Sequence, residues 1–125
     1  MICVDSNYLI RGLVEGTSEA RELTEWHLAG VPLAAPAIAW YEFLCGPVTP
    51  EQIGAMDAFL SAGLIPFEAP QAAEAARLFN AAGRPRRLRV DAMIAASAIV
   101  ARARFATGNR ADFRIFAPFG LQLLG

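Results

Sequence analysis

Four acidic side chains border or interrupt apolar segments of this sequence, namely Asp5, Glu42, Asp91 and Asp112. Asp5 follows the apolar run 1–4, and Asp91 stands at the front of an apolar segment over 92–104. Burying a carboxylate among apolar side chains is costly unless it is protonated, paired or bound to a cation. The four acids are therefore the first candidates for chemistry, and the partner that would balance their charge has to be identified.

The elements that position these acids follow from the pattern of apolar runs. Buried strands are predicted at 1–4, 31–35, 64–67 and 105–107, with a fifth short strand at 121–124. Helices are predicted at 8–14, 19–28, 37–45, 50–62, 70–82 and 92–104. This alternation predicts an α/β protein with three layers, α/β/α, around a short and mainly parallel sheet, in a single domain over 1–125.

Several residues mark the expected ends of helices. Ser18 is predicted to cap the helix 19–28, and Thr49 begins a capping box whose fourth residue is Gln52. Pro36 is expected as the first residue of a helix, because proline lacks the amide hydrogen that this position does not use. Arg102 and Arg104 are predicted to close the helix 92–104, where positive charge favours the negative end of the helix dipole.

Parallel strands deliver their carboxyl ends to one edge of a sheet, and ligands bind in the crevice there. Asp5 lies just past the first strand, while Asp91 begins a helix, and helices of such folds begin at this same edge. The next strand returns the chain, so Asp112 is expected near Asp91. Several carboxylates in one crevice repel each other, and a divalent cation relieves that repulsion. Oxygen ligands without nearby histidine or cysteine favour Mg²⁺ or Mn²⁺ over zinc.

Each acid also has an ordinary structural explanation. Asp5 and Asp91 could be helix caps, Asp112 a turn residue, and Glu42 a protonated or surface-reaching side chain. Their predicted convergence at one edge is what favours a shared site.

Composition excludes several classes of protein. All eleven basic residues are arginine, so the lysine that a P-loop or an aspartyl-phosphate site requires is absent. Cys3 and Cys45 form no paired motif and are expected to be packed, reduced thiols. No signal peptide or membrane span is predicted, and a cytoplasmic protein is expected.

Four segments carry a family resemblance in their order along the chain. The segment 5–10, DSNYLI, resembles the opening D-[ST]-x-x-L-I motif of PIN-domain ribonucleases, and 42–46, EFLCG, resembles their E-L-x-x-G. The segment 91–96, DAMIAA, is similar to their D-x-x-I-A-A, and 107–113, TGNRADF, to their T-x-N-x-x-D-F. The length and the third motif resemble the toxins of VapBC-type toxin-antitoxin modules. One departure is Ala39-Trp40-Tyr41, where many relatives carry a small hydroxyl residue before the glutamate.

The resemblance implies an endoribonuclease dependent on Mg²⁺ or Mn²⁺, usually a homodimer, inhibited by a cognate antitoxin whose tail enters the acidic crevice. Metal activation of a water would support in-line attack on an RNA phosphodiester. Asp5 and Asp91 are the expected direct ligands, while Glu42 and Asp112 would bind the metal directly, bind through water, or orient the nucleophile. Three polar residues are expected to support the carboxylates by hydrogen bonds: Asn7, Thr107 and Asn109. Five arginines are candidates for phosphate contacts: Arg84, Arg86, Arg87, Arg89 and Arg110.

The alternative from another class is a PIN-like module that binds RNA or protein without cleaving it. His27, the only histidine, is expected to have a packing or surface role. Trp40 and Tyr41 could stack on bases, but a dimer interface is the favoured interpretation.

Overall fold

A four-stranded parallel sheet lies at the centre of the computed structural model, which describes residues 1–125. The strands are β1 (Ile2–Val4), β2 (Leu33–Pro36), β3 (Gly63–Ile65) and β4 (Arg104–Ala106), in the order β3-β2-β1-β4. In register, Cys3 of β1 lies beside Ala34 on one side and Phe105 on the other. Every residue of β1 and β2 is buried, which is why these strands are continuous apolar runs. The predicted parallel sheet is confirmed.

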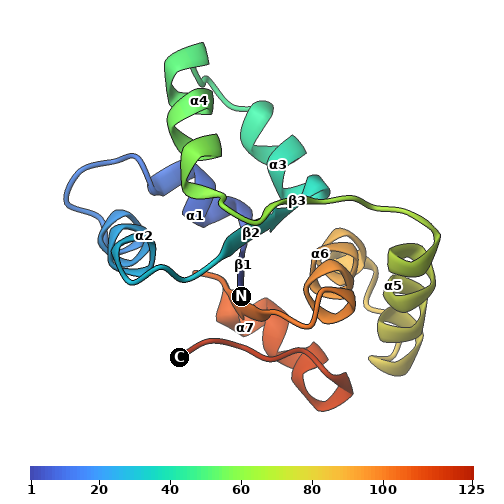
Figure 1. Ribbon diagram of the computed structural model, residues 1–125. Helices are drawn as coiled ribbons and strands as arrows, with labels where there is room; N and C mark the ends of the chain where they lie inside the picture. Colours follow the sequence, from blue (N-terminus) through green and yellow to red (C-terminus); the bar gives the residue numbers. More distant parts are fainter.

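Helices cover both faces of this sheet, as predicted for a three-layer fold. In Figure 1, α1, α2 and α4 lie to one side of the strands, and α5 and α6 lie to the other. Their bounds are α1 (Ser6–Arg11), α2 (Ser18–Leu28), α3 (Ala37–Leu44), α4 (Pro50–Phe59), α5 (Ala69–Ala81), α6 (Arg89–Val100) and α7 (Arg110–Phe113), with 3₁₀ turns η1 (Arg86–Leu88) and η2 (Arg114–Phe119).

Helix α6 is buried on most of its surface, as the apolar segment predicted. Residues 94–98 are all buried, and most of them are alanine. Small side chains allow a helix to lie close to the sheet and to a neighbouring helix. Ser97, the polar residue among them, satisfies its hydroxyl by donating to the Met93 carbonyl at 3.0 Å. The helix therefore provides a rigid support for the residues at its amino end.

Both ends of α6 differ from the prediction. The helix begins at Arg89, so Asp91 lies in its first turn and is not the residue in front of it. It begins earlier because Leu88 is buried and anchors the preceding 3₁₀ turn. The helix ends at Val100, and Arg102 has a left-handed backbone with a φ of 55°. Arg104 is already in β4, so the prediction that these two arginines close the helix is wrong.

Other helix ends moved by one to three residues. The helix predicted at 8–14 lies at Ser6–Arg11, with Asp5 as its cap. Thr17, and not Ser18, caps α2, with its hydroxyl accepting from the Ala20 amide. The prediction that Pro36 is the first residue of a helix is wrong, because its backbone is extended and it ends β2 in front of α3. The capping box at Thr49 is confirmed. The helix predicted to reach residue 62 ends at Phe59, since the chain must turn there to enter β3.

The predicted fifth strand is only an isolated parallel bridge between Phe105 and Leu123. Cys3 is buried as expected, but Cys45 is exposed because α3 ends at Leu44 and turns its last residues outward. His27 packs edge-on against Phe59, with 5.5 Å between ring centroids, which agrees with its predicted packing role. No helix is both long enough and apolar enough to cross a membrane.

Candidate active site

Three of the four acidic residues follow strands of the sheet, and the fourth lies at the start of a helix. Asp5 lies between β1 and α1, Glu42 lies in α3 after β2, and Asp112 lies in α7 after β4. Asp91 occupies the first turn of α6, at the amino end of that helix. The parallel topology places the carboxyl ends of these strands at one edge, so the first three acids share that edge with the start of α6.

The four carboxyl groups are near enough for the charge of one to affect the ionisation of another. The pKa of Asp91 is raised to about 6, first by partial burial and then by the negative charges of Asp5, Asp112 and Glu42, against a smaller opposing effect of Arg87. The charge of Asp5 also raises the pKa of Glu42. Asp91 is therefore the acid whose ionisation is opposed by all three others.

Asp5 is held by donors from two parts of the chain. It is 5% exposed, and burial raises the pKa of its carboxyl group. The Ser6 amide donates to Oδ1 at 2.7 Å, and the Thr107 hydroxyl donates to Oδ2 at 2.7 Å. These hydrogen bonds lower the pKa again, with Thr107 contributing most. Asp5 thus has a fixed orientation and a partly compensated charge.

Glu42 is more exposed than the sequence suggested. Its neighbours in α3 are apolar, yet its own side chain lies on the solvent side of the helix. Partial burial and then Asp5 raise the pKa of its carboxyl group, while a hydrogen bond with the Ser6 side chain lowers it. The expected burial penalty is therefore smaller, because water reaches this carboxylate.

Ser6 is a site residue that was not among the predicted ones. Its hydroxyl group lies near Asp5 and Glu42 and lowers the pKa of both carboxyl groups. A hydroxyl group has one hydrogen to donate, so Ser6 can donate to only one of these carboxylates at a time. The hydroxyl position of the D-[ST] motif was the signal available in the sequence.

Asp112 is paired with a cation of this same chain. Arg87 contacts Oδ1 at 2.9 Å, and the Asn109 amide group donates to Oδ2 at 2.8 Å. Both contacts lower the pKa of the Asp112 carboxyl group, with Arg87 having the larger effect. Asn109 also donates its backbone amide to the Thr107 hydroxyl at 3.0 Å, which connects the surroundings of Asp112 to those of Asp5.

The arginines proposed to contact phosphate have different surroundings. Arg87 points at the acidic cluster, Arg89 lies over the Phe79 ring at 5.0 Å, and Arg110 donates to the Leu124 carbonyl. Arg84 and Arg86 are exposed and form no ion pair. These two are the arginines of the group that remain free to meet a ligand.

The carboxylate oxygens of the four acids suit a hard divalent cation, but they do not surround one ion completely. Mg²⁺ and Mn²⁺ prefer oxygen ligands such as carboxylates, and the raised pKa of Asp91 means that a nearby cation would favour its ionised form. However, no three side chains among the histidines, cysteines, aspartates and glutamates lie close enough together to hold one ion. Mg²⁺ commonly binds through one or two carboxylates and keeps several waters, and this arrangement fits the residues present.

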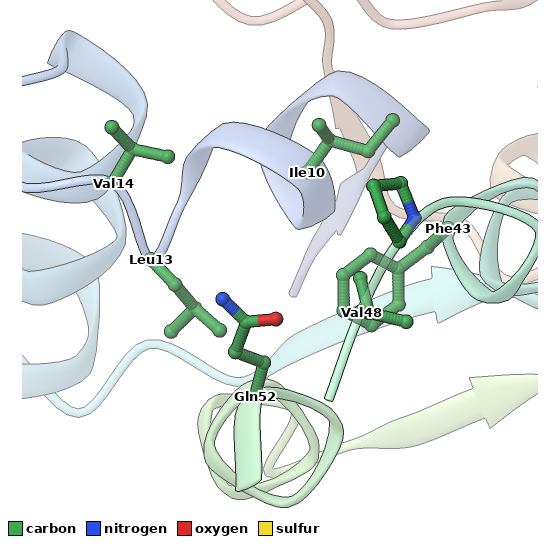
Figure 2. Close-up of a pocket in the computed structure, with 7 residues that line it drawn as sticks. Ile10, Leu13, Val14, Phe43, Val48 and Gln52 are labelled. Carbon is green, nitrogen blue, oxygen red and sulfur yellow. The ribbon is translucent and has the colours of Figure 1, made fainter. Parts of the chain in front are cut away.

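A separate apolar cavity lies away from the acids. It has a volume of about 190 Å³ and is lined by Ile10, Leu13, Val14, Phe43, Pro47, Val48 and Gln52. Figure 2 shows Gln52 reaching from one helix toward Leu13, with Phe43 and Val48 beside it. None of the four acids lines this cavity. Its lining is mostly apolar and contains no ionisable side chain.

Comparisons with known proteins agree with the motifs. A family model described as the PIN domain matches residues 2–117. No curated protein sequence matches the chain.

Several solved structures are similar over nearly the whole chain. VapBC2 from Rickettsia felis, bound to a promoter DNA fragment, is 20% identical, with 99% of this chain and 98% of that chain covered and a TM-score of 0.70. FitAcB from Neisseria gonorrhoeae is 17% identical, with 100% and 97% covered and a TM-score of 0.71. A toxin-antitoxin complex from Klebsiella pneumoniae is 26% identical, with 90% of each chain covered and a TM-score of 0.65. The resemblance predicted from the four motifs is confirmed.

Proposed function

Because the chain belongs to the PIN domain family, whose members among toxins are generally nucleases, we propose that it is a metal-dependent endoribonuclease. The observation that carries the proposal is the raised pKa of Asp91, to about 6, which results first from partial burial and then from the charges of the other three acids. Groups with strongly perturbed pKa values cluster at functional sites, since catalysis needs them there. A purely structural aspartate in the first turn of a helix would have a lowered pKa, because the helix dipole stabilises its charge.

Each acid has a role that follows from its surroundings. Asp5 and Asp91 are proposed as direct ligands of Mg²⁺ or Mn²⁺. Asp5 is fixed by two hydrogen-bond donors, and the ionised form of Asp91 is disfavoured by burial and by the three other acids, so a cation would stabilise it. Glu42 is accessible to water and can hold or orient the attacking water molecule. A divalent cation at this site supplies the electrophilic stabilisation that a phosphodiester requires when negative charge develops during hydrolysis.

Asp112 has a different position in the proposed site. Its charge is already balanced by Arg87, so it supports a cation through water more readily than by direct contact. Arg84 and Arg86 are proposed to contact RNA phosphates, because both are exposed and unpaired at the start of the segment leading to Asp91.

The proposal extends to partners. Solved structures similar to this chain are described as toxin-antitoxin complexes, some of them bound to DNA. We propose that this chain is the toxin of such a pair, acts in the cytoplasm and forms a homodimer. Tyr41, 66% exposed on α3, is a residue of the proposed dimer interface, beside Trp40, whose ring packs on Phe43 at 5.1 Å.

Cleavage of RNA by the purified protein tests the enzymatic part. We expect cleavage with Mg²⁺ or Mn²⁺, none in chelator, and a loss of at least about 100-fold in Asp91→Asn. Asp57→Asn is the matched control, because Asp57 is exposed on α4 and outside the cluster. Cleavage that persists in chelator would overturn the metal dependence.

A second candidate is a module that binds RNA or protein without cleaving it. The absence of three side chains within reach of one ion favours it. Growth measurements separate the two: expression without an antitoxin should arrest growth and Asp5→Ala should relieve the arrest, whereas a binding module would bind RNA without cutting it.

A further inference from the structure

One short loop controls the hydrogen bonds of two acids. Thr107 donates to Asp5, and Asn109 donates to Asp112 through its side chain. The Asn109 amide also donates to the Thr107 hydroxyl, so the two contacts are linked through the loop itself. Gly108 is the residue between them, and it forms neither contact. The position of this loop relative to α1 therefore determines the orientation of the Asp5 and Asp112 carboxylates.

Gly108 lies so close to the Asn7 side chain that a larger residue at position 108 would require Asn7 or the loop to move, while its backbone conformation does not favour glycine. Its φ is not among the positive values of this chain. A Cβ atom added at residue 108 would lie 2.1 Å from Asn7 Nδ2 and 3.2 Å from Asn7 Cγ. Real Cβ contacts are essentially never shorter than 3.0 Å. The Asn7 side chain thus occupies the volume that any other residue at position 108 would fill.

The position of the Asn7 side chain beside Gly108 is not explained by hydrogen bonds to its Oδ1 atom. Its Oδ1 atom is buried and has no hydrogen-bond partner. Leaving a buried acceptor unpaired is unfavourable, and such cases call for an explanation. Asn7 lies in the first turn of α1, two residues after Asp5, so its amide connects the helix that Asp5 caps with the loop that holds Asp112.

We propose that Asn7 and Gly108 form an interlock that positions the loop 107–109 and, through it, the carboxylates of Asp5 and Asp112. Both are positioning residues, and neither contacts substrate. The effect on metal binding rests on the proposed function, because it assumes that these carboxylates share a divalent cation. The interlock itself is a property of the fold and can be measured without any metal.

Gly108→Ala, Asn7→Ala and the double variant test this interlock. Gly108→Ala should displace the loop, and the Asn109 backbone and side-chain amide signals should shift in ¹H–¹⁵N NMR spectra of the metal-free protein. Mn²⁺ affinity, measured by calorimetry, should fall at least tenfold. In the double variant the shorter side chain at residue 7 leaves room for the new methyl group, so the Asn109 signals and Mn²⁺ affinity should return toward those of Asn7→Ala. Gly54→Ala is the matched control, because a Cβ at that helical glycine meets no atom within 4 Å.

Two results would overturn the interlock: unchanged Asn109 signals in Gly108→Ala, or a double variant as disturbed as Gly108→Ala. If Gly108→Ala does not fold, recovery of folding in the double variant supports the interlock, and failure of both refutes it. A wild-type protein that neither binds Mn²⁺ nor cleaves RNA would refute the proposed function, while the Asn109 signals would still decide the interlock.

Discussion

The Thr107 hydroxyl donates a hydrogen bond of 2.7 Å to the Asp5 carboxylate across 102 positions of the sequence. Both residues are buried, and they follow the neighbouring parallel strands β4 and β1. The Asp5 amide donates to the Ala106 carbonyl at 2.9 Å, so the backbones are also joined at this point. The segments that follow β1 and β4, the first and last strands along the chain, thereby fix the Asp5 carboxylate together.

Replacing Thr107 with valine should remove the principal donor to Asp5 and leave its buried carboxylate with an unsatisfied oxygen. We expect unfolding free energy to fall by about 1–3 kcal/mol at pH 7. Thr107→Ser should retain most of the stability because it keeps the hydroxyl. Thr24→Val is the control, since the Thr24 hydroxyl donates to the Ala20 carbonyl on the exposed face of α2. Urea denaturation of the four proteins measures the difference, and equal losses in the valine and serine variants would contradict it.

Ser6→Ala should weaken metal binding with little effect on the fold. Its hydroxyl lowers the pKa of the Asp5 and Glu42 carboxyl groups, whereas the hydrogen bond from its backbone amide to Asp5 survives the substitution. We expect Mn²⁺ affinity to fall by roughly 3–10-fold, the effect of one lost supporting hydrogen bond near a metal ligand. Ser18→Ala, on the exposed start of α2, should leave the affinity unchanged. If Ser6→Ala binds Mn²⁺ with unchanged affinity in the calorimetric titration, Ser6 does not support the metal ligands.

Asp91→Asn should stabilise the metal-free protein while abolishing its activity. The folded-state pKa of Asp91 is about 6, above the value near 3.9 of an unfolded aspartate. The folded state therefore binds more protons between about pH 4 and pH 6, and unfolding free energy falls as pH rises through this window. At pH 7 the variant should gain about 1–2 kcal/mol, a figure reduced for partial solvent exposure. Denaturation in chelator at pH 4 and pH 7 is the measurement, and the gain should vanish at pH 4.

Metal affinity should rise with pH, whereas the stability contributed by Asp91 falls as pH rises. A cation must displace the proton that Asp91 holds below about pH 6. For one such group, Mn²⁺ affinity should fall about tenfold between pH 7 and pH 5. Calorimetry at several pH values measures this dependence. An affinity that stays constant across this range would show that Asp91 is not a ligand.

Arg84→Gln should lower both RNA affinity and its salt dependence. One lost phosphate contact reduces the slope of log affinity against log salt by about 0.7 for a single strand. Arg21→Gln is the matched control, since Arg21 is equally exposed and unpaired but lies on α2, which Figure 1 places on the opposite side of the sheet from α5 and α6. Both arginine substitutions should be made in the inactive Asp91→Asn variant, so that RNA is not cleaved during the titration. Equal slopes for the two arginine variants would remove Arg84 from the proposed RNA surface.

The fold could be predicted because its signals are local. The strand Ile2–Val4, the capping box at Thr49 and the buried helix α6 each follow from neighbouring residues. The prediction that Asp5, Asp91 and Asp112 converge was based on parallel topology, which fixes where strand ends meet.

The remaining details depend on contacts between distant segments. The start of α6 at Arg89 depends on burial of Leu88, and the pairing of Arg87 with Asp112 joins residues 25 positions apart. The exposure of Glu42 depends on which face of α3 meets the core. None of these can be obtained from the composition or spacing of nearby residues, because tertiary packing decides them.

The order of the strands also determines when this site can exist during synthesis. Asp5 is synthesised 102 positions before its partner Thr107, which follows the strand β4. At about 5–20 residues per second, roughly 5–20 s separate the synthesis of Asp5 from that of Asp112. Throughout that interval a nascent chain lacks the complete cluster. A nuclease of this design would therefore be inactive until the ribosome had synthesised Asp112.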